Sequence, residues 1–116
     1  MFKTKKLSIL LVLLALLVGL SVTFGAAAQT GRVFYWVSHG SPADPVWTYF
    51  LAGANQWATD TGNIVRTSFH SGDVPSHQEA IRAAIAAGAD GIVSSSPDPG
   101  SLVEVVAEAR AAGTPI

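Results

Sequence analysis

The stretch SHQEAIRAAIAAGADGIVSS, residues 76–95, is the most informative part of the sequence for the fold, because it predicts one helix and one strand in direct succession. Ser76 and Glu79 have the spacing of a capping box, in which hydroxyl and carboxylate each bind a free backbone amide at a helix start. Gly88 suits the left-handed turn that ends a helix, and Gly91 to Ser95 is a short apolar run typical of a strand. Between them, apolar residues recur at helical spacing and predict a buried stripe: Ile81, Ala84 and Ile85.

The same order of elements is repeated on both sides of this stretch. Upstream, residues 32–38 predict a strand, Gly62 ends the helix that follows, and residues 63–69 predict a second strand. Downstream, Ser101 to Glu104 has the spacing of another capping box, and Gly113 precedes a strand expected to begin near residue 114. The two flanking helices carry these apolar stripes: Trp47, Phe50, Leu51, Ala54, Trp57 and Ala58, then Leu102, Val105, Val106 and Ala109.

Strand, loop, capped helix and glycine, three times over, predict βαβ units on a parallel sheet. Right-handed crossovers place helices on both faces of such a sheet. The expected fold class is therefore α/β, a doubly wound three-layer sandwich. Because the sequence stops as a fourth strand begins, we expect it to be a fragment of a longer protein.

The first residues predict a secretory signal peptide over residues 1–28. Three lysines lie within the first six residues, Leu7 to Leu20 is almost wholly apolar, and Ala26 to Ala28 suits signal peptidase. We expect cleavage before Gln29 and a periplasmic or secreted product. An uncleaved anchor is the alternative, since Leu7 to Ala28 is just long enough to span a bilayer. Apart from the signal peptide, we expect no contact between this protein and the membrane.

Composition excludes several classes of function. The sequence contains no cysteine, which excludes disulfides, thiol catalysis, cysteine-based zinc sites and lipoprotein acylation. After the predicted signal, four arginines oppose eight carboxylates, so residues 29–116 carry a formal charge of −4. A mildly acidic surface without basic clusters argues against nucleic acid as a partner.

Three loops are candidates for a site because ligands bind at the carboxyl ends of parallel strands. They are His39 to Val46, His70 to Pro75, and Ser94 to Gly100. Each contains an aspartate that could instead cap a helix or form a turn: Asp44, Asp73 and Asp98. Trp47 likewise suits either the core or a ligand face.

Known catalytic and metal-binding patterns are missing. His39, His70 and His77 form no HExxH motif and no close pair in the sequence. There is also no GxSxG nucleophile elbow and no phosphate-binding glycine motif. We therefore expect no catalytic residues, no metal and no cofactor.

Two segments resemble a known family: HGSPADPVWTYFLAGANQWATDTG at 39–62, and HQEAIRAAIAAGADGIVSSSPDPGSLVEVVAEARAAGTPI at 77–116. They look like the amino-terminal lobe of type I periplasmic substrate-binding proteins, the ribose- and galactose-binding-like receptors of ABC transporters. The resemblance implies that residues 29–116 are a partial amino-terminal lobe of the periplasmic binding protein-like I fold. It also implies a second lobe, a small ligand, expected to be a monosaccharide, and a membrane permease as partner.

The resemblance also implies where the ligand sits. Asp44, just before a proline, matches a polar contact, Trp47 matches a stacking aromatic, and Ser96 precedes Pro97 in a matching loop. Val46 stands where an aromatic is often found, a departure that leaves the particular sugar open. The complete set of expected ligand-binding residues is His39, Ser41, Asp44, Trp47, Ser95, Ser96 and Asp98.

Two other functions remain open at this point. A secreted α/β enzyme could use His39 and Asp44 as acid and base. A sensory receptor could pass its closed form to a membrane kinase. Substrate turnover would indicate the enzyme, whereas ligand-induced stabilisation without turnover would indicate a receptor.

Overall fold

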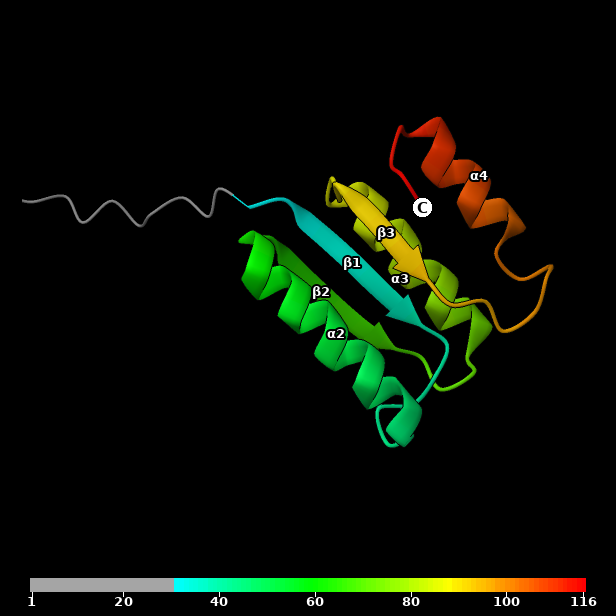
Figure 1. The fold of residues 1–116 in the computed structure, drawn as a ribbon. Coiled ribbons are helices and arrows are strands. Elements are labelled where there is room, and N and C mark those ends of the chain that lie inside the picture. Colours follow the sequence, from blue (N-terminus) through cyan, green and yellow to red (C-terminus); the bar gives the residue numbers. More distant parts are fainter. Residues whose placement is uncertain (1–30) are drawn as a thin grey trace, which may run out of the picture.

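Three parallel strands form the sheet of this protein, shown by a computed structural model that describes residues 31–116 (Figure 1). They are β1 (Val33–Ser38), β2 (Ile64–Phe69) and β3 (Gly91–Ser94), arranged in the order β2-β1-β3. Both neighbours pair with β1 in parallel, so β1 is the central strand. The three predicted strands are thus confirmed, while the predicted signal peptide at residues 1–28 lies outside the described residues.

The helices are α2 (Pro45–Thr61), α3 (Val74–Ala86) and α4 (Val103–Ala111). Asp44 and Asp73 cap the first two, each accepting a hydrogen bond from a backbone amide in the first turn. The predicted glycine ends are confirmed, because the glycines after the three helices all have positive φ angles that other residues adopt at a cost: Gly62 at 69°, Gly88 at 71° and Gly113 at 74°.

The two predicted capping boxes are wrong. In α3, Asp73 Oδ1 accepts from the amide of Ser76 at 3.0 Å, so the cap lies upstream of Ser76. Pro75 suits the first helical turn because it has no amide to satisfy. In α4 the cap position is Leu102, which makes no side-chain cap bond. The Ser101 hydroxyl donates instead to the carbonyl of Asp98.

Helices cover both faces of the sheet, which confirms the three-layer α/β architecture. Successive side chains of a strand point to opposite faces. On one face Val37 and Ile92 pack against α3 and α4, and on the other Phe34 and Trp36 meet aromatic side chains of α2. The buried core on the α3–α4 side comprises Val37, Ile81, Ala84, Ala89, Ile92, Leu102 and Val105.

Polar contacts join α3 to α4 and to the loop before it. The Arg82 guanidinium donates to both carboxylate oxygens of Glu108, with Nε–Oε2 and Nη2–Oε1 distances of 2.9 Å. Gln78 Nε2 donates to the Ser101 carbonyl at 2.6 Å. Residues 114–116 form no regular strand, although the Pro115 carbonyl accepts from Ile92 N at 2.8 Å, beside β3 where a fourth strand is expected.

We predict that Ile81→Ala will lower the free energy of unfolding by about 2–5 kcal/mol, because it removes a fully buried side chain from the α3–α4 layer. Urea unfolding followed by circular dichroism measures this. Val103→Ala is the matched control, since Val103 is 66% exposed on α4. Equal unfolding midpoints for the two variants would contradict the core assignment.

Candidate functional site

The candidate site lies where the loops after β1 and β3 separate. These strands are neighbours, yet the first loop leads to α2 on one face of the sheet and the second leads to α4 on the other (Figure 1). Such a switch point leaves a crevice at the carboxyl ends of the strands, the usual ligand position in open α/β sheets. All seven predicted ligand-binding residues belong to these two loops or to the first turn of α2.

His39 and Ser95 bridge the two loops. The Ser95 hydroxyl oxygen accepts from the His39 amide at 2.9 Å and lies 2.7 Å from His39 Nδ1. Its other contact, Ser38 Oγ, is 3.5 Å away. The tautomer of His39 decides which group donates in the contact between Ser95 and Nδ1; when Nδ1 accepts, the ring carries its N–H group on Nε2 and can donate it to a ligand.

Ser38 lies beside this bridge and is not among the site residues predicted from the sequence. It is completely buried at the end of β1, and its hydroxyl oxygen accepts from the Gly40 amide at 3.0 Å. A serine at the end of a strand otherwise made of Val and aromatic residues is the signal that could have identified it. A buried hydroxyl needs a partner, and here the partner is the loop backbone.

The loop after β2 is tied to the loop after β1. The amides of Ser71 and Gly72 donate to the carbonyls of Gly40 and His39, at 2.9 and 2.8 Å. Ser71 has a φ of 48°, a left-handed conformation that costs energy in a residue with a Cβ atom. The strained turn directs these amides at the neighbouring loop and holds the three loops together.

Trp47 packs against the same loop and is only half-buried. Its ring lies edge-to-face with His39, with centroids 5.3 Å apart, and near Phe50 at 5.6 Å. A Cβ atom on Gly40 would overlap the indole, so glycine is required at that position. The structure therefore agrees with both interpretations of Trp47, core packing and ligand contact, because its ring contacts the core and is partly open to solvent.

The remaining predicted residues shape their own loops. Asp44 Oδ1 accepts from the Val46 amide, which confirms its capping role. The Ser41 hydroxyl oxygen accepts from the Ala43 amide. The Ser96 hydroxyl donates to the Asp98 carbonyl, and Asp98 Oδ1 accepts from two amides at 2.9 Å, as a turn former does. Among residues 31–116, the side chains of Ser96 and Asp98 make hydrogen bonds within their own loop and none to the first loop.

His70 and His77 form a stacked pair behind the site, with ring centroids 5.5 Å apart. His77 is 1% exposed, and its Nε2 lies 2.8 Å from the Ser94 hydroxyl oxygen. Burial, and secondly the nearby His70 and His39, lower the pKa of His77 below its ordinary value. Between residues 31 and 116, no group of three or more His, Asp or Glu side chains could hold a metal ion.

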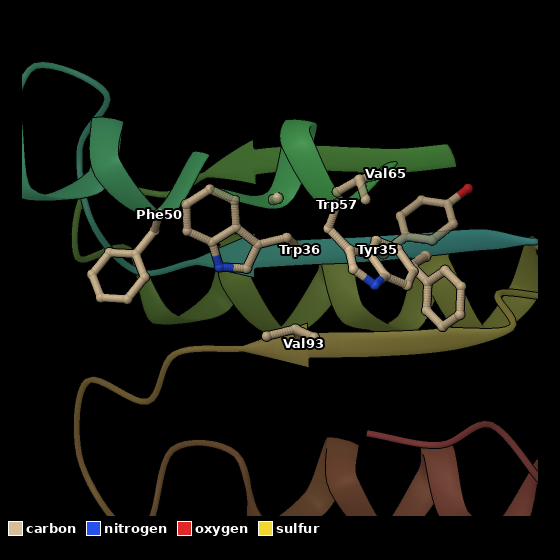
Figure 2. A pocket seen from close by; sticks show the side chains of 8 residues that line it. Tyr35, Trp36, Phe50, Trp57, Val65 and Val93 are labelled. Atoms are coloured by element: carbon tan, nitrogen blue, oxygen red, sulfur yellow. The ribbon is translucent and has the colours of Figure 1, made fainter. Parts of the chain in front are cut away.

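A separate groove of about 370 Å³ runs beside α2 on the face of the sheet that α2 partly covers (Figure 2). Its lining is almost entirely apolar and includes Trp36, Phe50, Trp57 and Val93. Phe50 and Val93 are 58% and 61% exposed. Because the lining supplies few polar groups, it does not suit a polar ligand, which needs several precisely placed partners.

Comparisons with known proteins agree with this geometry. The profile of a family described as the periplasmic binding protein domain matches residues 34–116. No curated protein matches the sequence. A periplasmic sugar-binding protein of an ABC sugar transporter from Legionella pneumophila is a similar solved structure, with 27% identity and a TM-score of 0.68 over 72% of this chain and 31% of that one.

A carbohydrate transporter protein from Acidothermus cellulolyticus 11B, solved in complex with myo-inositol, has 27% identity and a TM-score of 0.68. The match covers 73% of this chain and 29% of that one. A solute-binding protein from Clostridium phytofermentans, solved with β-D-glucose, shares the fold at 22% identity and a TM-score of 0.64, over 72% of this chain and 25% of that one. This chain thus spans less than a third of these structures, and it belongs to the periplasmic binding protein domain family.

Proposed function

We propose that this protein is a secreted solute-binding receptor that captures a monosaccharide or a similar polyol for uptake by an ABC transporter. The observation that carries the proposal is the His39–Ser95 bridge at the switch point of the sheet, with a half-buried Trp47 packed on His39. This arrangement sets hydrogen-bonding groups and an aromatic ring at the carboxyl edge, where the fold places ligands.

The relatives support a sugar-like ligand. The Acidothermus cellulolyticus protein, 27% identical, was solved with myo-inositol, a cyclic polyol. The Legionella pneumophila protein, also 27% identical, is described as sugar-binding. These relatives are ABC transporter or carbohydrate transporter proteins, so the proposed partner is a membrane permease and the proposed compartment is the periplasm.

The chemistry of a sugar suits the residues of the site. A pyranose has an apolar C–H face that packs on an aromatic ring, and hydroxyl groups that need partners. Trp47 would supply the ring, and His39 Nε2 would supply a donor. Asp44 uses Oδ1 for its cap, and its exposed carboxylate can accept a hydroxyl proton in a charge-assisted bond.

The proposed receptor needs a second wall. Residues 29–116 would form part of an amino-terminal lobe, and a second lobe would close over the ligand and bury it. Ser41, Ser95, Ser96 and Asp98 would complete the polar rim on this side. Half a cleft leaves much of a ligand exposed, so tight binding requires both lobes.

The enzyme alternative has less support. An acid–base pair formed by His39 and Asp44 would need hydrogen-bond reach between the groups or to a shared substrate atom. Within the described residues, His39 Nδ1 is directed to Ser95 and Asp44 Oδ1 to its own helix. We therefore propose binding without turnover.

The function is tested with the protein expressed from its complete gene. D-glucose, myo-inositol and 5-methylthioribose are added separately, with L-leucine as a control of another chemical class. We expect at least one of the sugars or polyols to raise the melting temperature and to be recovered unchanged, because ligand binds the folded state alone. Stabilisation by leucine only, or conversion of a sugar to product, would overturn the proposal.

We predict that Trp47→Ala weakens binding of the stabilising sugar by about five- to thirtyfold, since a lost stacking contact costs roughly 1–2 kcal/mol. Isothermal titration calorimetry measures the change. Trp47→Phe should lose less affinity because it keeps a ring. Tyr49→Ala is the control on the same helix, since Tyr49 is 79% exposed. Unchanged affinity in Trp47→Ala would assign Trp47 to packing alone.

A further inference from the structure

The buried ring of His77 connects the start of α3 to the end of β3. His77 Nε2 lies 2.8 Å from Ser94 Oγ, and the Ser94 hydroxyl donates its single hydrogen to the Ser95 carbonyl at 3.1 Å. His77 Nδ1 is buried without a partner among the described residues, so a proton on Nδ1 would be an unsatisfied donor, whereas a proton on Nε2 can be donated to Ser94 Oγ. The neutral ring therefore favours the Nε2–H tautomer.

The connection continues from Ser95 into the candidate site. The Ser95 hydroxyl oxygen accepts from the His39 amide, and the neighbouring Ser38 oxygen accepts from the Gly40 amide. Gly40 is the residue against which Trp47 rests. Ser95 therefore helps to position the loop that carries His39 and that contacts the Trp47 ring at the start of α2.

Protonation of His77 would leave its Nε2–H group able to donate to Ser94 but would place a charged ring in a buried position, which destabilises the arrangement. Among residues 31–116, His77 Nδ1 has no hydrogen-bond partner, so a second proton would create a buried N–H group without an acceptor. The positive end of the α3 dipole also disfavours a charged ring in its first turn. His70 differs, because each of its ring nitrogens has a hydroxyl partner, Ser76 for Nδ1 and Ser68 for Nε2.

The groups that face the His77 ring come from three elements. The loop after β2 contributes His70, the loop after β1 contributes His39, and β3 contributes the uncharged Ser94 hydroxyl. Burial first, then His70 and His39, lower the pKa of His77. Its neutral form therefore persists below the ordinary imidazole value of about 6.5 and is lost as the pH falls through the lowered pKa.

We propose that His77 is a positioning residue of the ligand site: while neutral it holds Ser94 and the Ser95–His39 bridge in place, and on protonation it releases them and ligand affinity falls. This inference rests on the proposed function. It makes the receptor acid-sensitive through a residue that need not touch the ligand.

The test measures the dissociation constant for D-glucose or myo-inositol, whichever binds more tightly, between about pH 7.5 and pH 5. In the unaltered protein the constant should rise about tenfold per pH unit below the His77 pKa, if only the neutral form binds. His77→Gln can donate to Ser94 without titrating, so it should keep the affinity at neutral pH and lose less in acid. His77→Leu cannot donate and should bind more weakly throughout.

His70→Gln is the matched control, because His70 stacks on His77 and lies outside the connection. Because His70 lowers the pKa of His77, its replacement should raise that pKa, so the acid loss should persist and begin at a higher pH. The inference is overturned by wild-type affinity in His77→Leu at neutral pH, or by an undiminished acid loss in His77→Gln.

Hydrogen exchange without ligand separates this inference from the proposed function. The amides of His39 and Gly40 bind Ser95 and Ser38, so their protection factors should fall in acid in the unaltered protein but not in His77→Gln. If this holds while no sugar binds, only the proposed function fails. If protection is insensitive to pH and to His77, the inference fails even where a sugar binds.

Discussion

The parallel pairing of β1 with strands on both of its edges is the constraint on which the rest of the structure depends. Val37 pairs with Ser68 on one side and with Ser94 on the other, so the ends of three strands lie in one row. Because the strands are parallel, all three following loops leave from the same edge. The loops after β1 and β3 therefore start side by side before they diverge to opposite faces. This brings His39 and Ser95 into contact although they are 56 positions apart in the sequence.

Apolar side chains lie along the middle of the sheet, and polar side chains lie at the carboxyl ends of the strands. At the middle of the sheet, one face is buried under the core that includes Ile81 and Val105. Aromatic residues of α2 partly cover the other face. The carboxyl edge instead carries hydroxyl and imidazole groups. Ser38, at that edge, and His77, in α3 beside it, are fully buried. Their contacts with the Gly40 amide and the Ser94 hydroxyl compensate much of the cost of burying them.

Most elements were predictable from local patterns, and the errors have a local cause. Strand residues were recognisable from β-branched and aromatic runs, and the helix ends from glycines that the structure places at positive φ. The predicted capping box assigned the Ser76 amide to the Glu79 carboxylate. In the structure this amide donates instead to Asp73, three positions earlier, so Asp73 is the cap. A spacing rule cannot decide between two acceptors, since the choice depends on the backbone direction entering the helix.

Residue type and spacing over a few positions are enough to predict the alternation of strands and helices, the three candidate loops and the aspartates in them. The contact of His39 with Ser95 and the burial of His77 on Ser94 follow only from the folded chain, and no metal site was expected at His77. These contacts join residues far apart in the chain, across strands whose order the sequence does not state. The pairing of β1 with β3 brings these residues together. Because His77 is buried, an imidazole N–H group without an acceptor is costly there.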